Sequence, residues 1–398
     1  MLKLQEAIKK IQQNKRLVVL RSCGSGFQER LLGELTAGYK VVDLSLPKLR
    51  LQAEQNPEMF LQDLFVNSGE VLSAQKQLSS SDTVDNKLMQ GIYFANLEYV
   101  PRLVKAIMEW QGKPVQVLAS CNQSYFLEEQ AGDEVSFAEL PLDGEEKGSL
   151  TAMMRNTQSA QPKDVYKQIL QGSMAQDAEL YVQRVLRRDI LERTTVSDEI
   201  KYYRFLSMVA NMLGKIVNYS ALANGVGITA PTGKLWLQYL VGTGMVYLLL
   251  AVCDLPGKRL IKAPKLYFKD TGVACSLLQL ADTSKLVASV YAKSLLENYV
   301  VNFIRESYLA KGQEPPLCFY KDSNNKEISL VAQEGNSLHA FMIASDLIKP
   351  NKLEKSFAII KEYAKYKNLA YQEGCLLTLG GSTQRLDELL WQQNIALL

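Results

Sequence analysis

A short apolar run, a glycine-bearing turn and a helical pattern follow one another near the start of the chain, and this stretch constrains the fold most. It covers residues 16–35, with the sequence RLVVLRSCGSGFQERLLGEL. A strand, a glycine loop and a helix in this order frame many phosphate-binding sites, because loop N–H groups and the helix N-terminus point at the anion. The stretch therefore predicts a strand that leads into a ligand-binding type of loop.

The loop lacks the side chains that phosphate chemistry requires. Gly24, Ser25 and Gly26 are present, but Gln28 and Glu29 stand where a Lys would reach the outer phosphates and a Ser or Thr would hold the metal. A carboxylate at position 29 would repel a triphosphate. Three interpretations stay open: an unrelated turn, a variant nucleotide site, or the remains of one.

The size and charge of the chain fit a protein of several globular domains. At about one domain per 150 residues, 398 residues predict two to four domains. A net charge of only +3 argues against a surface coated for nucleic acid, although it allows a local basic patch. The six cysteines form no CxxC pair, so we expect reduced thiols, no metal centre and a cytoplasmic protein.

One uncharged stretch, Leu235 to Cys253, has about the length of a membrane span. It contains Gln238 and the helix breaker GTG at residues 242–244. We therefore expect a helix followed by a strand, and no contact with a membrane.

Strands alternate with helices in the N-terminal third, which predicts a parallel, doubly wound sheet. The expected strands are Tyr39–Leu44, Gly91–Leu97 and Val115–Ser120, with a helix over Pro101–Trp110 and a polar loop or insertion over Val66–Gln90. In a nucleotide hydrolase the second of these strands would end in carboxylates that hold Mg²⁺. It ends instead in Ala95 and Asn96, which makes a second required element absent.

Charged helical segments follow, and then a pattern typical of a winged helix-turn-helix. Tyr181–Glu192 predicts an amphipathic helix with Asp189 on its polar side. Farther on, Ser220 is expected to cap a short helix, Gly227 to allow the turn, and Thr229 to cap the next helix. A hairpin is expected to pair Met245–Leu250 with Arg259–Ile261 as a wing that also carries Lys265. Candidate DNA contacts are Thr232, Lys234 and Gln238 on the helix and Lys258, Arg259 and Lys262 on the wing.

The C-terminal part reads helix, three strands, helix and strand, the order of a restriction-endonuclease-like core. The expected elements are Lys293–Ser307, Leu317–Lys321, Glu327–Ala332, Leu338–Ile343, Leu353–Lys367 and Gly374–Leu379. The metal site of such a core needs carboxylates and a Lys that project to one edge. Ser329, Met342 and Ala344 occupy these places, and the two glutamates that remain, Glu297 and Glu327, do not complete the site.

Several stretches together resemble the AAA+ superfamily ATP-binding proteins of bacteria and archaea. They include GKIVNYSALANGVGITAPTGKLWLQYLVGTGMVYLL, KRLIKAPKLYFKDTGVA, LLENYVVNFI and FYKDSNNKEISL, with weaker matches in the N-terminal half. The resemblance implies an α/β chain in four parts. These are an AAA-like P-loop domain over residues 1–143, a helical lid or linker over 144–200, a winged helix-turn-helix over 201–275 and a nuclease-like α/β domain over 276–398.

The family pattern has Gly-Lys-Thr in the first loop, Asp-Glu after the strand that ends at Ala95, and Asp then Glu-x-Lys in the nuclease-like core. This chain has lost the required residues at all three places. We therefore expect a catalytically inactive scaffold or regulator that needs no cofactor and acts on a protein partner or on DNA through the winged helix. The alternatives are an ATP-binding protein without efficient hydrolysis and a winged-helix DNA-binding regulator; the sequence leaves the oligomeric state open.

Cys23 and His339 are two further candidates for a catalytic role. Cys23 ends a strand before the glycine loop, as a phosphatase nucleophile does, but Glu29 stands where the phosphate-binding Arg would be required. His339 is the only histidine, and no nucleophile motif lies near it in the sequence. Neither residue predicts an enzyme.

Overall fold

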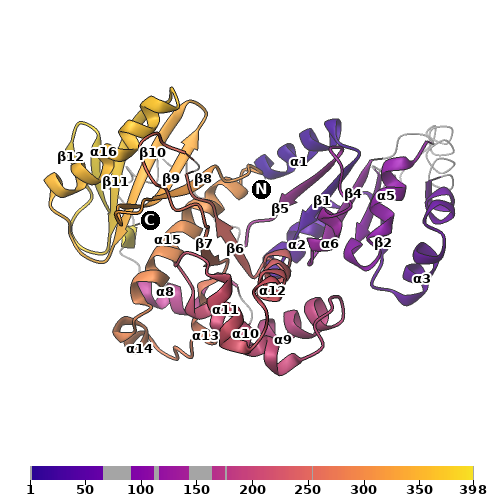
Figure 1. Ribbon diagram of the computed structural model, residues 1–398. Helices are drawn as coiled ribbons and strands as arrows, with labels where there is room; N and C mark the ends of the chain where they lie inside the picture. The colour runs from indigo at the N-terminus through magenta and orange to yellow at the C-terminus, as the bar shows by residue number, and fades with distance from the viewer. Residues whose placement is uncertain are drawn as a thin grey trace. The chain divides into compact units, whose positions relative to one another are not determined.

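The computed structural model describes residues 2–65, 91–111, 116–142, 164–174, 177–252 and 254–397. The expected loop or insertion over Val66–Gln90 and part of the expected helical linker lie outside these residues. The chain divides into two compact units (Figure 1). The first contains Met1–Gly144 with Gly242–Gly244 and Leu309–Glu314, and the second contains Glu145–Val241, Met245–Tyr308 and Pro315–Leu398.

The centre of the first unit is a parallel sheet, as the sequence predicts, and it has five strands. Its strands are β1 (Leu17–Arg21), β2 (Tyr39–Asp43), β3 (Gly91–Ala95), β4 (Val117–Cys121) and β5 (Val135–Glu139), in the order β2-β3-β4-β1-β5. Every neighbouring pair is parallel. The expected strands agree with β2, β3 and β4 to within two residues at each end, and β5 is an addition.

Helices cover both faces of this sheet because β1 is apolar at every position of its buried run. Val18 and Leu20 pack with Leu4 and Ile8 of α1 (Leu2–Asn14) in one cluster. Leu17 and Val19 belong to a second cluster with α5 (Arg102–Glu109) and α3 (Pro47–Gln55). Side chains alternate between the faces of a strand, so a continuous apolar run indicates a strand buried on both faces.

The second unit contains a group of helices, two of which meet through three aromatic rings. The helices are α8 (Val165–Gln171), α9 (Ala178–Arg184), α10 (Glu199–Asn211), α11 (Tyr219–Val226), α12 (Ala230–Gly242), α13 (Thr271–Leu277) and α14 (Thr283–Ala288). Tyr202 and Phe205 of α10 lie 5.0 and 5.4 Å, ring to ring, from Trp236 of α12. The Tyr202 hydroxyl also donates to the Trp236 carbonyl at 3.1 Å, which satisfies the polar end of a fully buried ring.

Two details of these helices differ from the sequence prediction. The amphipathic helix continues beyond α9 as a π-helix, η2 (Val185–Leu191), and its wider turn brings Asp189 into the interior, with 2% of its surface exposed. Asn218, not Ser220, caps α11 by accepting the Ala221 N–H at 3.0 Å. Gly227 does end α11 in a left-handed conformation, with φ 67°, and Thr229 accepts the Thr232 N–H as expected.

A six-stranded mixed sheet forms the rest of the second unit. The chain runs α15 (Ala292–Leu309), β8 (Leu317–Lys321), β9 (Glu327–Glu334), β10 (Ser337–Ala344), α16 (Pro350–Tyr366), β11 (Ala370–Thr378), β12 (Gln384–Asp387) and β13 (Leu390–Asn394). The strand order is β12-β13-β11-β10-β9-β8. This confirms the predicted helix and strand order as far as β11. The last two strands are additions.

The expected wing hairpin is wrong in its second strand. β6 (Val246–Leu249) pairs with β7 (Lys265–Phe268), not with Arg259–Ile261. Residues near Arg259 instead extend the edge of the C-terminal sheet, where the Ile261 N–H donates to the Lys321 carbonyl at 3.0 Å. The uncharged stretch from Leu235 is divided between α12 and β6, as predicted. Among the described residues, no helix combines the length and apolar character that crossing a membrane would require.

Candidate functional site

The loop after β1 lies at the carboxyl edge of the parallel sheet, where ligands of doubly wound proteins bind. β1 lies between β4 and the edge strand β5. The Ser22 N–H donates to the Cys121 carbonyl at the end of β4, at 2.9 Å. The loop then enters α2 (Gly26–Leu35), so its backbone donors are placed as a phosphate loop would place them.

The side chain of Gln28 occupies the inside of this loop. Its Oε1 atom accepts the backbone N–H groups of Cys23 at 3.0 Å and Ser25 at 3.3 Å, and the Ser22 hydroxyl at 3.1 Å. Its Nε2 donates to the Leu140 carbonyl at 2.9 Å, and only 2% of the residue is exposed. An uncharged amide oxygen therefore receives the donors that a phosphate oxygen would need.

The other loop residues serve the geometry of the turn. Ser25 caps α2 by accepting the Gln28 N–H at 3.1 Å, and its hydroxyl donates to the Leu142 carbonyl at 3.2 Å. Gly24 adopts a φ of 74°, in the region that glycine favours. Gly26 begins α2, and Glu29 is exposed in its first turn, where a carboxylate suits the helix dipole.

After β3, where a nucleotide hydrolase would hold its metal, Asn96 forms a polar contact with β2. Ala95 is the last residue of β3, and Asn96 follows it in a left-handed conformation with φ 58°. The Asn96 side-chain amide donates to Asp43 Oδ1 at 2.9 Å. Burial raises the pKa of Asp43, but hydrogen bonds from Ser45 and Asn96 outweigh that effect and hold the pKa below its usual value.

A buried carboxylate at this edge was not predicted. Glu98, in the short helix η1 (Leu97–Tyr99), is 6% exposed, and its Oε1 accepts the Asn122 N–H at 3.1 Å. Nearby, the hydroxyls of Tyr93 and Ser120 are 2.6 Å apart. Burial raises the pKa of Tyr93 to about 12, although the Ser120 contact acts in the opposite direction. Through its hydrogen bond with the Asn122 N–H, Glu98 ties the loop after β4 to η1. Its only signal in the sequence was the position of a Glu just after the end of a strand.

The three positions at which the sequence predicts the metal site of a nuclease-like core carry no metal ligands. Phe341 of β10 lies opposite Leu330 of β9, and Met342 and Ser329 are the residues next to this last pair on their strands. The Ser329 hydroxyl accepts the Ile343 N–H at 3.2 Å. Met342 and Ala344 pack against the apolar cluster beneath α16. The surroundings of these residues are those of a packed core.

The two remaining glutamates bind lysines. Lys265 of β7 has 2% of its side chain exposed, and its Nζ lies 2.7 Å from Glu297 Oε1 and also contacts Glu327. Tyr267 donates to Glu297 at 2.6 Å, and Lys321 Nζ lies 2.7 Å from Glu327 Oε2. The predicted position of Lys265 on an exposed wing is therefore wrong. Two ammonium groups balance two carboxylates in this cluster.

The surrounding charges favour the ionised forms of Lys265 and Glu327. Burial lowers the pKa of Lys265, but the attraction of Glu297 and Glu327 outweighs it and raises the pKa above the usual value. Burial likewise raises the pKa of Glu327, but Lys265 and Lys321 outweigh it and lower the pKa. Within the described parts of the chain, no group of three or more His, Cys, Asp or Glu side chains is placed to hold a metal ion.

The candidate DNA contacts fall on two different parts of the second unit. Lys234 and Gln238 are exposed on α12, and Thr232 is half-buried in its first turn. Arg259 and Lys262 are exposed and Lys258 pairs with Glu362 of α16 at 3.4 Å. The helix group lies on α12, whose Trp236 packs against α10. The other group lies beside β8 and α16, where Ile261 contacts Lys321 and Lys258 contacts Glu362.

Cys23 and His339, the two other candidates for catalysis, are also buried. The Cys23 thiol lies 3.3 Å from Gln28 Oε1, inside the loop. His339 lies in β10 with its Nδ1 3.5 Å from Glu373 and its Nε2 3.9 Å from Glu334. Both belong to packed regions of the fold.

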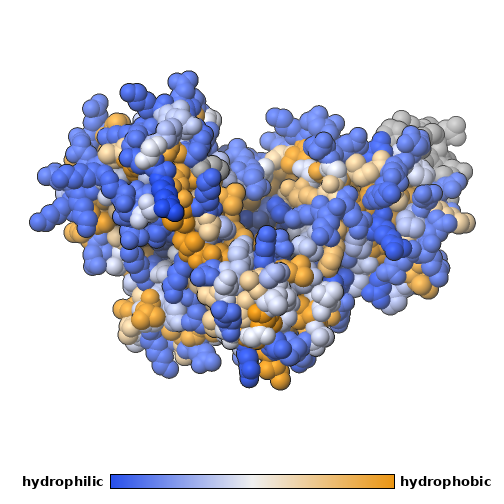
Figure 2. Space-filling model, viewed as in Figure 1, coloured by the Kyte–Doolittle hydropathy of each residue, from blue (hydrophilic) through white to orange (hydrophobic). Residues whose placement is uncertain are grey.

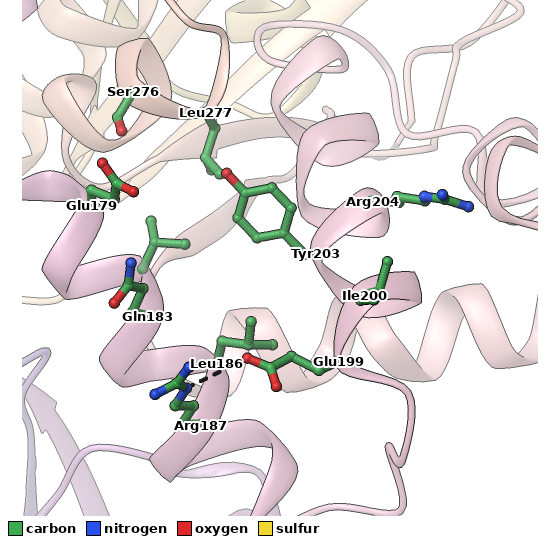
Figure 3. A pocket seen from close by; sticks show the side chains of 11 residues that line it. Glu179, Gln183, Leu186, Arg187, Glu199, Ile200, Tyr203, Arg204, Ser276 and Leu277 are labelled. Atoms are coloured by element: carbon green, nitrogen blue, oxygen red, sulfur yellow. Dashed lines mark hydrogen bonds and ion pairs between the residues drawn. The ribbon is translucent and has the colours of Figure 1, made fainter.

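A surface pocket of about 440 Å³ lies between α9, η2, α10 and α13 (Figure 3). Leu186, Ile200, Tyr203 and Leu277 give it an apolar lining, and Arg187 meets Glu199 at 3.4 Å at its edge. Sequence reasoning missed the pocket because helices from three separate stretches form it.

Comparison with known proteins matches two domain families of unknown function. Residues 162–284 match a domain of unknown function (DUF8612), and residues 292–398 match another (DUF4143). Among solved structures, a Walker-type ATPase of Pyrococcus abyssi is similar over 70% of this chain and 95% of that chain, at 10% identity and a TM-score of 0.33. No curated protein matches the chain. The parallel sheet that opens with a strand, a loop and a helix is consistent with a P-loop domain.

Proposed function

We propose that this protein is a scaffold or regulator built on an ATPase-like fold, and that it does not turn over ATP. The observation that carries the proposal is the Gln28 side chain, whose Oε1 takes the N–H groups of Cys23 and Ser25 inside the loop. A nucleotide would have to displace a buried amide and also approach Glu29. The loop offers no lysine in compensation, and Ala95 and Asn96 stand where metal-binding carboxylates would be required at the end of β3.

Calorimetric titration of the purified protein with ATP and Mg²⁺, together with a phosphate-release assay, tests this proposal. We expect no saturable heat at millimolar nucleotide and no turnover. Saturable heat without turnover would favour the alternative, an ATP-binding protein without hydrolysis. Turnover that disappears in Gln28→Ala would overturn the proposal, since it would assign a catalytic role to the residue that fills the loop.

The proposal extends to the C-terminal sheet. We take its helix and strand order, α15 to β11, as a nuclease-like fold that has become structural. The pairing of Glu297 and Glu327 with Lys265 and Lys321 supports this view, because a cation already lies between the carboxylates. Thermal stability that is the same in EDTA and in millimolar Mg²⁺ or Mn²⁺ is the expected result.

A second candidate function is DNA binding by a winged helix. Two helices joined at Gly227, followed by the β6–β7 hairpin, have the order of that module, and Lys234 and Gln238 stand on one side of α12 at i and i+4. Loss of a specific site on changing Lys234 and Gln238 to Ala would support this candidate. Undiminished binding by that variant would count against it.

A further inference from the structure

Positive charge is concentrated in two stretches of the second unit. Residues 254–262 and 349–367 contain nine Lys or Arg and three Asp or Glu, a net charge of +6. The whole chain carries only +3, so the rest of it carries −3. Clustering of this kind on a chain with little net charge is the electrostatic footprint of a polyanion-binding surface.

The fold brings the two stretches together. Lys258 meets Glu362 of α16 at 3.4 Å. Asp254 accepts the Tyr366 hydroxyl at 3.0 Å and lies 2.7 Å from Lys367 Nζ. Two of the three anions are thus already paired within the surface. The positive charge that remains faces solvent.

The exposed cations of these stretches form what we call the basic face. Its members are Arg259, Lys262, Lys349, Lys352, Lys355, Lys361 and Lys365, all of them exposed. Lys355 lies on the side of α16 opposite the buried residues Leu353, Phe357 and Ile360, and Lys365 lies on the flank of the helix. In the described part of the chain, neither of these two lysines forms an ion pair. Figure 2 shows hydrophilic side chains over the part of the surface where Figure 1 draws α16.

The extent of the basic face favours a long ligand over a small anion. Thirteen residue steps separate Lys352 from Lys365, which is about 20 Å along a helix. Duplex DNA carries one charge per about 1.7 Å of its axis, so a duplex along α16 would present roughly a dozen phosphates over this length. The cations lie on the outer side of a helix and on an extended segment, which suits contact with a phosphate backbone.

The apolar side of α16 argues against a membrane surface as the partner. A helix that lies on a membrane inserts apolar side chains between the lipids. In α16 these side chains are the buried Leu353, Phe357 and Ile360, which are at most 1% exposed and form part of the sheet core. The ligand that fits is a polyanion that needs no apolar contact.

We propose that the basic face binds the phosphate backbone of duplex nucleic acid without regard to sequence. The basic face shares no residue with the loop after β1 or with α12. The proposal therefore holds whether or not the protein binds ATP, and it does not require base recognition by Lys234 and Gln238. Arg259 and Lys262, which the sequence analysis assigned to the wing, contact the phosphate backbone together with the lysines of α16.

The test is fluorescence anisotropy of the full chain with a labelled 20-base-pair duplex of arbitrary sequence, over a range of salt concentrations. One variant changes Arg259, Lys262, Lys355 and Lys365 to Gln. A matched control changes the exposed residues Lys3, Lys9, Lys10 and Lys48 to Gln, an equal loss of charge in the first unit. A third variant changes Lys234 and Gln238 to Ala.

We expect the basic-face variant to lose at least tenfold in affinity and the slope of log K against log salt to become shallower by about 3 to 4, since each phosphate contact contributes about 0.9. The control and the α12 variant should bind like the wild type. The proposal is overturned if the wild type does not bind the duplex, if the control loses as much as the basic-face variant, or if only the α12 variant loses affinity. Binding to anionic vesicles but not to the duplex would also overturn it. Circular dichroism spectra confirm that each variant is folded.

Discussion

Replacing Gln28 by Ala removes the side chain that organises the loop after β1. The change deletes three hydrogen bonds to the main chain: those from the N–H groups of Cys23 and Ser25, and that to the Leu140 carbonyl. A buried hydrogen bond contributes about 1 kcal/mol net, so we expect the loop to open about 3 kcal/mol more easily. At 1.4 kcal/mol per factor of ten, this is roughly a 150-fold increase in the open population.

Hydrogen exchange of the amides in residues 22–28 measures this local opening directly, without requiring the two units to unfold together. The matched control is Arg30→Ala, an exposed residue of α2, which should leave the exchange rates unchanged within a factor of about two. Rates in Gln28→Ala that stay within threefold of the wild type would refute the reasoning. They would mean that Gln28 is not what satisfies these donors.

Two further predictions concern carboxylates of the second unit, Asp270 and Glu327. Asp270 accepts the N–H groups of Ser173, Met174 and Val273 at 2.7 to 2.9 Å, so Asp270→Ala should cost about 4 kcal/mol of unfolding free energy. Asp282→Ala, which removes an exposed cap of the same kind, should cost about 1 kcal/mol in the same urea titration; equal losses would contradict the account. The lowered pKa of Glu327 means that its stabilising effect is present above the unfolded pKa, near 4.5, and is lost as pH falls through the folded pKa. By calorimetry from about pH 6 to pH 3, Glu327→Gln should therefore be less stable than the wild type at pH 6 and approach it in acid, and a gap that does not change with pH would disprove the assignment.

Local pattern in the sequence was enough to predict most of the secondary structure. The parallel sheet follows from apolar runs such as LVVL in β1, and the C-terminal elements from α15 to β11 follow from their alternation. The errors occurred where local pattern carries no signal. The π-helix η2 changes the helical period, and this turns Asp189 inward. The partner of β6 is decided by tertiary packing, which favours β7 over the segment Arg259–Ile261 that lies closer in the sequence.

The sequence by itself determined which chemistry is missing, because a lysine or a carboxylate that is absent from a position cannot be supplied by folding. Only the tertiary structure decided what fills those places. Gln28 closes its loop through Leu140, which is 112 residues away, and Glu297 and Glu327 are held by Lys265 from another part of the chain. Buried polar groups must find partners wherever the fold brings them close, and that proximity depends on contacts between residues far apart in the sequence.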